Sequence, residues 1–308
     1  KISIYIYVAF STTDSKVSPH NSMSIGSIVA SLFAFGKLKK FFSSASQTIA
    51  PAPSPVPIPI PVPEEMSDPT AWMIDNSLSE FLLMPGGVLY MCMLGYTFLH
   101  GCKVFKAFPK NASLSYKIVS MVLACTGGGI MVPIFLNSIP VPLANDAYPI
   151  AILISFALHY YFPILREVAG MSTIFKVLLV VFYECTRSGV VVKITYFAGS
   201  TIAASTFGFP LFGPIACGTI GGCGGAFLPF SKGLDPIKAG LASPMLTAFV
   251  GATCFHLYLN TSLSEGCVDA KAKAHVFMTL FFIAVGIVNT LGLSASAAKT
   301  VAVKTKSE

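Results

Sequence analysis

Long apolar stretches follow one another along most of the chain, and short polar segments separate them. Each stretch contains few charges and is close to the roughly 20 residues that a helix needs to cross the core of a bilayer. The pattern therefore predicts an all-α membrane protein with seven transmembrane helices. Their predicted ranges are residues 82–102, 116–136, 147–165, 172–197, 207–230, 243–260 and 274–293.

Two of these stretches contain the same interrupted motif. The first motif is TGGGIMVP, from Thr126 to Pro133, and the second is GCGGAFLP, from Gly222 to Pro229. The second copy begins 96 positions after the first (222 − 126), and a proline follows each copy seven residues later. Nearly the same spacing relates two histidines in aromatic surroundings, His159 and His256. The chain therefore contains an internal repeat, and such paired interruptions indicate a transport site.

The number of spans sets the geometry of this repeat. Spans one to three form one unit and spans four to six the other, so each unit crosses the membrane an odd number of times. The second unit is therefore upside down relative to the first, and a site would lie between them near the midplane. The prediction is two inverted three-helix repeats plus a seventh helix. The alternative is a duplication that built a stable fold without a pathway.

The glycine clusters have two interpretations, which can hold together. Small residues allow helices to approach closely, whereas consecutive glycines before a proline let a helix unwind in the membrane, because proline removes a backbone donor. Freed backbone groups are tolerated only against protein or in a wet cavity. The second interpretation makes these residues pore hinges: Gly127, Gly128, Gly129, Pro133, Gly222, Gly224, Gly225 and Pro229.

The fourth predicted span carries the only charges deep in the membrane. Glu184 and Arg187 are three residues apart, so they share a helix face and can pair. A charge at the centre of a bilayer costs at least about 2.5–3.5 kcal/mol, so such residues usually face a cavity. A structural ion pair that locks this span to its neighbours is the alternative. Lys193, near the end of the span, can extend to the lipid headgroups.

Composition and charge agree with a membrane protein and add its orientation. Apolar residues make up 54% of the chain and charged residues 11%, with a mean hydropathy of +0.74. The loops after spans one, three and five and the C-terminal tail hold most of the basic residues. The positive-inside rule therefore places the C-terminus in the cytosol. The net charge of +7 reports this topology, and nothing in its distribution predicts a nucleic-acid partner.

The ends of the chain differ from its middle. Residues 1–50 are rich in serine and poor in acidic residues, which predicts a disordered or targeting extension. Residues 51–77 form a proline-rich linker, because alternate prolines up to Pro63 impose a stiff polyproline II spacer. Residues 78–293 form the membrane domain, and residues 294–308 a basic cytosolic tail.

Enzyme, metal and cofactor signatures do not occur in the sequence. The eight cysteines lack metal-ligand or disulfide spacing, and most lie in apolar spans as packing residues. His159 and His256 are more consistent with packed or interfacial side chains than with ligands. No hydrolase, metalloprotease or nucleotide-binding motif is present. We therefore expect neither an enzyme nor a metal or cofactor site.

From residue 80 to residue 293 the pattern resembles the trimeric intracellular cation (TRIC) channel family. The TGGG of Thr126–Gly129 is similar to the prokaryotic branch, and Tyr183–Arg187 keeps the Glu and Arg of the eukaryotic Lys-Glu-Val…Arg motif while losing its lysine. The resemblance implies a homotrimer with one pore per protomer that conducts monovalent cations such as potassium. It also implies an endoplasmic reticulum membrane, counter-ion conduction, and a bound anionic lipid such as a phosphoinositide.

The resemblance further implies roles for particular residues. The pore and gating residues would be Thr126, Tyr183, Glu184 and Arg187, and Arg187 and Lys193 would bind the lipid. Two other functions remain open. The same inverted architecture serves small-solute transporters that work by alternating access, and a non-conducting scaffold would use its glycines only to pack helices.

Overall fold

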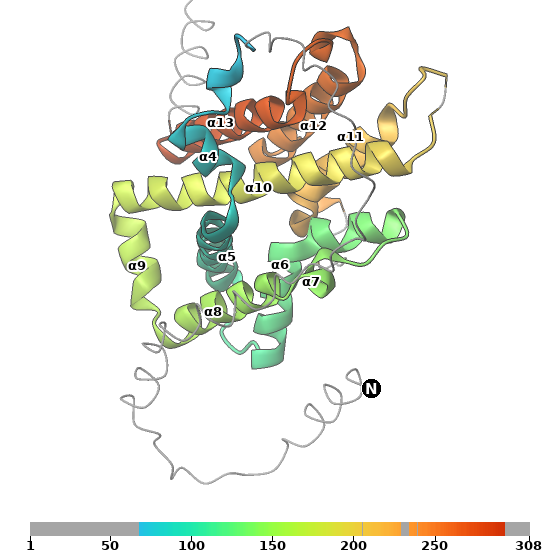
Figure 1. Ribbon diagram of the computed structural model, residues 1–308. Coiled ribbons are helices and arrows are strands. Elements are labelled where there is room, and N and C mark those ends of the chain that lie inside the picture. Colours follow the sequence, from blue (N-terminus) through green and yellow to red (C-terminus); the bar gives the residue numbers. More distant parts are fainter. Residues whose placement is uncertain (1–67, 205, 229–233, 239, 293–308) are drawn as a thin grey trace, which may run out of the picture. The chain divides into compact units, whose positions relative to one another are not determined.

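The computed structural model describes residues 68–204, 206–228, 234–238 and 240–292, and every regular element in them is a helix (Figure 1). These residues all belong to one compact unit. The predictions for residues 1–67 and 294–308 lie outside the described residues, as does Pro229. The principal helices are α4 (Ser77–Leu83), α5 (Gly86–Ala107), α6 (Leu114–Phe135), α7 (Val141–Ala144), α8 (Ala147–Tyr161), α9 (Ile164–Met171), α10 (Thr173–Thr201), α11 (Phe212–Cys223), α12 (Ser243–Asn260) and α13 (Ala270–Thr290).

Each predicted span corresponds to a helix, and together they describe a multi-pass membrane protein. Three helices, α5, α6 and α13, are long and apolar enough to cross a bilayer by themselves. A fourth span is possible if α8 and α9 are counted together, although the pair is bent by 96°. The helices of the other three predicted spans do not meet the same criterion of length and apolarity, for physical reasons. Helix α10 carries four charges, α11 has only 12 residues, and α12 combines 18 residues with several polar ones.

Local signals fix where the helices begin and end. The side chains of Asn76, Ser113 and Ser172 accept backbone N–H groups at the starts of α4, α6 and α10. Such caps satisfy donors that the first turn of a helix leaves free. Between α4 and α5, Met84 adopts a left-handed conformation with φ of 54°. Pro163 separates α8 from α9, because the residue before a proline avoids the helical conformation.

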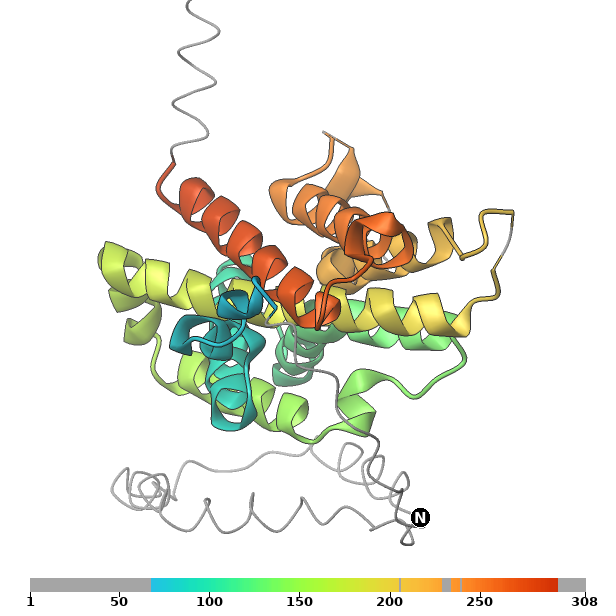
Figure 2. The same ribbon diagram turned by 45° about the horizontal axis from the view of Figure 1, so that its top comes forward.

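Helix α10 is the central element of the domain. It packs against α5, α11, α12 and α13. In both views α12 and α13 lie on one side of α10, and α5 and α8 lie on the other (Figure 1, Figure 2). Val191 and Val192 of α10 form a buried cluster with residues of α12 and α13, including Ala248 and Phe282. The helix that carries the deeply placed charges, α10, is therefore also at the core of the fold.

Residues 68–77, which the sequence assigns to a linker, instead belong to the folded domain. Asp68 forms an ion pair with Lys273 of α13, and the Lys273 amine also donates to the Thr70 hydroxyl at 2.6 Å. A short 3₁₀ turn follows at Ala71–Met73. The linker assignment ends too late because Lys273 looks like an ordinary loop cation in the sequence, and its partner lies 205 positions away.

The two repeat-related histidines are packed inside the protein, as predicted. His159 of α8 and His256 of α12 are buried and bond to backbone carbonyl oxygens of Phe98 at 2.8 Å and Pro210 at 2.6 Å. Each ring also lies against a glycine of an earlier long helix, Gly101 for His159 and Gly199 for His256. The eight cysteines are all free.

Candidate functional site

The two glycine motifs meet face to face. Gly127 and Gly128 of α6 lie against Gly224 and Gly225, which belong to the 3₁₀ turn η2 (Gly224–Ala226) that follows α11. A methyl group on Gly127 would lie 2.6 Å from Cα of Gly225, and one on Gly224 would lie 2.6 Å from Cα of Gly128. The contacts are reciprocal. We call this contact of four residues the glycine crossing.

Backbone oxygens make the crossing intolerant of side chains. A Cβ on Gly128 would overlap the carbonyl oxygens of Ile220 and Gly221, and one on Gly225 would overlap that of Ala124. Gly129 and Gly222 differ, because their nearest neighbours are side chains: Val141 for Gly129, and Val191 and Ala248 for Gly222. Close backbone approach is therefore the requirement that the glycine crossing fulfils.

The predicted unwinding occurs at only one of the two motifs. Helix α6 continues unbroken from Leu114 to Phe135, through its three glycines and through Pro133, so the expected break is absent there. Pro133 is buried in the last turn of α6, and its missing N–H removes the donor that would otherwise bond the Gly129 carbonyl four residues earlier. In the second motif, α11 ends at Cys223 and the chain continues as the 3₁₀ turn.

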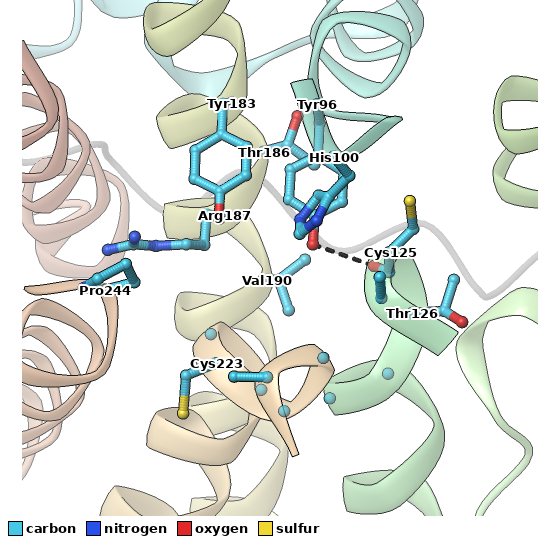
Figure 3. Close-up of a pocket in the computed structure, with 18 of the residues that line it drawn as sticks. Tyr96, His100, Cys125, Thr126, Tyr183, Thr186, Arg187, Val190, Cys223 and Pro244 are labelled. Atoms are coloured by element: carbon cyan, nitrogen blue, oxygen red, sulfur yellow. Dashed lines mark hydrogen bonds between the residues drawn. The ribbon is translucent and has the colours of Figure 1, made fainter. Parts of the chain in front are cut away.

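A cavity of about 290 Å³ lies beside the glycine crossing, inside a single chain (Figure 3). Its walls come from α5, α6, α7, α8, α10, α11, η2 and the start of α12. We call it the central cavity. Of the predicted site residues, those lining it are Thr126, Gly128, Gly129, Tyr183, Arg187, Gly222, Gly224 and Gly225.

The other predicted site residues lie elsewhere. Gly127 forms part of the crossing behind the cavity wall, and Pro133 lies further along α6. Glu184 is buried next to Arg187 but is not part of the lining. Lys193 is exposed. It is six residues from Arg187, which corresponds to about 240° around the helix, so the two cations occupy different faces of α10.

Arg187 is buried and held by three neighbours. Its side chain is 3% exposed, and its Nε lies 3.3 Å from Oε2 of Glu184. The guanidinium also donates to the Thr247 hydroxyl of α12 and lies 4.4 Å from the ring centre of Phe282 in α13. Figure 3 shows the side chain directed toward Pro244, at the start of α12, and away from Tyr96 and His100. The predicted pairing of Glu184 with Arg187 is present.

An aromatic group that the sequence reasoning missed forms another wall of the central cavity. Tyr96 stacks on Tyr183 with ring centres 5.1 Å apart, and its hydroxyl donates to the Cys125 carbonyl at 3.0 Å. The edge of His100 packs on Tyr96, with ring centres 4.6 Å apart, and its buried Nε2 has no partner among the described residues. Tyr96 and His100 are four residues apart, so helical spacing was the available signal.

Comparison with known proteins identifies the fold through structure alone. No protein-family model matches the sequence, and no characterised protein matches it by sequence. The structure superposes on a trimeric intracellular cation channel from C. elegans, solved without Ca²⁺, with a TM-score of 0.55 and 16% identity. That match covers 69% of this chain and 95% of the other.

Two further solved structures agree with this match. One is a TRIC counter-ion channel studied for its activity in calcium release, with a TM-score of 0.51 and 18% identity over 72% of this chain and 97% of the other. The other is a TRIC cation channel studied for its conductance, with a TM-score of 0.51 and 16% identity over 68% and 92%. These neighbours are channels and not enzymes. The chain therefore has the TRIC channel fold, and the predicted resemblance is confirmed at the level of fold.

Proposed function

We propose that the protein is a channel for monovalent cations of the potassium type, with one pore inside each protomer. The observation that carries the proposal is the central cavity at the glycine crossing. It lies within one chain, between the two halves of a fold that its structural neighbours use as a cation channel. Ligand sites between repeats, at interrupted helices, are the general arrangement in membrane transport proteins.

An inverted repeat is part of this proposal, and two sets of contacts support it. Gly127 faces Gly225 while Gly128 faces Gly224, which is the reciprocal pattern expected at a two-fold axis that relates Gly127 to Gly224 and Gly128 to Gly225, a spacing of 97 (224 − 127). The pairs Gly101–His159 and Gly199–His256 also recur with nearly the same spacing. Seven spans, two inverted three-helix units and a seventh helix account for both.

The residues of the central cavity take distinct roles. Gly128, Gly224 and Gly225 fix the width of the pathway, because any side chain there would meet backbone. Thr126 and Tyr183 line the pathway, and Arg187 together with Glu184 controls gating. The Arg187 charge would raise the barrier for a cation if Glu184 did not compensate it.

Assembly and location complete the proposal. The protein forms a homotrimer in an intracellular membrane, the endoplasmic reticulum, with its C-terminus in the cytosol, and carries counter-ions. An anionic lipid such as a phosphoinositide binds beside α10. The exposed Lys193 can reach headgroups at the membrane surface, whereas a phosphate could reach Arg187 only through the central cavity. An arginine fork suits phosphate.

A bilayer recording and a cross-linking experiment test the proposal. Purified protein in planar bilayers with a potassium chloride gradient should give unitary current steps that reverse near the potassium equilibrium potential. Slow, saturable flux without steps would instead favour the alternating-access transporter, and no flux at all would favour the scaffold. Cross-linking in detergent should give about three times the chain mass of 32.6 kDa, and a dimer would contradict the trimer.

A further inference from the structure

The central cavity has an unexpected charge balance for a cation pathway. Among the described lining residues, Lys103 of α5 and Arg187 of α10 carry formal charges, and neither is acidic. The walls from α6, α7, α8, α11, η2 and α12 contribute residues without formal charge. His100 is the titratable neighbour on α5, one turn before Lys103. A positive lining opposes cations unless each charge is compensated.

Arg187 forms an ion pair with a carboxylate, and among the described residues Lys103 does not. Glu184 lies 3.3 Å from Arg187, and the guanidinium is further held by Thr247. Lys103 takes part in neither of the ion pairs found among the described residues. Its Nζ lies 5.0 Å from the ring centre of Tyr183, and Glu184 interacts with it only at a range longer than an ion pair. The contact with the ring positions an ammonium group but leaves its charge in place.

The position of Lys103 is also suited to acting at one end of the pathway. It lies in the last turns of α5, it is exposed to solvent, and it still forms part of the cavity lining. Its amine is therefore at the mouth of the central cavity, and Tyr183 holds it toward the interior. A charge at a wet mouth acts over about a Debye length, so its effect must depend on salt.

We infer that Lys103 is a conductance-setting residue: a fixed positive charge, held by Tyr183, that lowers the local concentration of cations at one mouth. This rests on the proposed function, because it requires cations to pass through the central cavity. A single charge also makes the two mouths unequal, so the current should be asymmetric with voltage.

The test compares Lys103→Gln with Lys106→Gln, because Lys106 lies one turn further along α5, is exposed, and does not line the cavity. At about 0.1 M potassium chloride, Lys103→Gln should raise unitary conductance about twofold, which corresponds to one charge about 5 Å from the ion in water with a Debye length of about 10 Å. At about 1 M the increase should nearly vanish, because screening shortens to about 3 Å. Lys103→Arg and Lys106→Gln should resemble the wild type.

The outcomes separate the two proposals. If the wild type gives no unitary current, the channel itself is refuted and this inference with it. If the wild type conducts and Lys103→Gln changes nothing at low salt, only the role of Lys103 is refuted. An equal increase in Lys106→Gln would also overturn it. Should Lys103→Gln be unstable, Lys103→Cys treated with positively or negatively charged thiol reagents changes the charge after folding, with treated wild type as the control.

Discussion

Helix α6 and the segment formed by α11 and η2 carry the same motif but differ in structure. Helix α6 runs for 22 residues through its glycines, whereas α11 ends after 12 residues and changes into a 3₁₀ turn. Glycine content gives a reason: α11 contains four glycines, and each is about 1 kcal/mol less favourable in a helix than alanine. Both segments nevertheless meet at the glycine crossing. The shared requirement is close backbone approach, and unwinding is a feature of one side.

The two halves also differ in charge. Helix α5 has its lysines only near its end, whereas α10 carries Glu184 and Arg187 in its buried middle. The second half of the protein therefore combines a helix that ends in a 3₁₀ turn with a buried ion pair. The first half has an unbroken helix and contributes Tyr96 and His100 to the aromatic wall. Substitutions on each side can show which of these differences matters for stability and which matters for conduction.

The largest effect is expected from breaking the ion pair. Glu184→Gln leaves the Arg187 guanidinium buried without a carboxylate, so the free energy of unfolding should fall by about 3–5 kcal/mol. Thermal unfolding in detergent, followed by size-exclusion chromatography, measures this. Glu184→Gln with Arg187→Met should recover much of the loss. Glu167→Gln, the same change at an exposed site of α9, is the control. If Glu184→Gln left the stability unchanged, the ion pair would contribute nothing to the fold.

The glycine crossing should give the next largest effect. Gly128→Ala and Gly225→Ala each place a methyl group against backbone oxygen, so each should destabilise the protein by about 1–3 kcal/mol and abolish most of the conductance. Equal losses on the two sides would support close approach as the common requirement. If only Gly225→Ala loses stability and conductance, the end of α11 at the 3₁₀ turn contributes more to both than the close approach at the glycine crossing.

Gly129→Ala is a matched change within the same triplet. Its methyl group would meet Cβ of Val141 at 3.3 Å, and Val141 belongs to the short helix α7, which can shift. The gain in helix propensity of about 1 kcal/mol should roughly offset this contact. We expect stability within about 1 kcal/mol of wild type and normal conductance. A loss as large as that of Gly128→Ala would mean that α6 must bend at its glycines.

The smallest effect is expected outside both halves, at the N-terminal segment. Hydrogen bonds from Lys273 and then Thr70 lower the pKa of Asp68 from 3.8 to about 2. Because this pKa is depressed, the pair stabilises the fold above about pH 4, and the contribution is lost as the pH falls through about 2. Between pH 4 and pH 2, the melting temperature of the wild type should therefore fall more steeply than that of Asp68→Asn. Asp75→Asn, an exposed change in the same segment, should follow the wild type.

The sequence predicted the helices well because apolar length is a local property. Glu184 and Arg187 could be paired from their spacing alone, and the two glycine motifs could be found as a repeat. What could not be predicted depends on contacts distant in sequence. Gly286 of α13 makes room for Glu184, since a methyl group there would lie 2.9 Å from Cγ of Glu184. Likewise, nothing local to Tyr96 or Lys103 indicates that both meet Tyr183.

The contact between Asp68 and Lys273 has a consequence for the order of events during synthesis. Its two residues are 205 positions apart, so a ribosome adding about 5–20 residues per second needs about 10–40 s to make the second after the first. Throughout that interval Asp68 and Thr70 lack Lys273 as a partner, while α5 to α12 are synthesised. The contacts of Asp68 and Thr70 with Lys273 can therefore form only after the start of α13 has been synthesised, which makes them a late step in the assembly of the described helices.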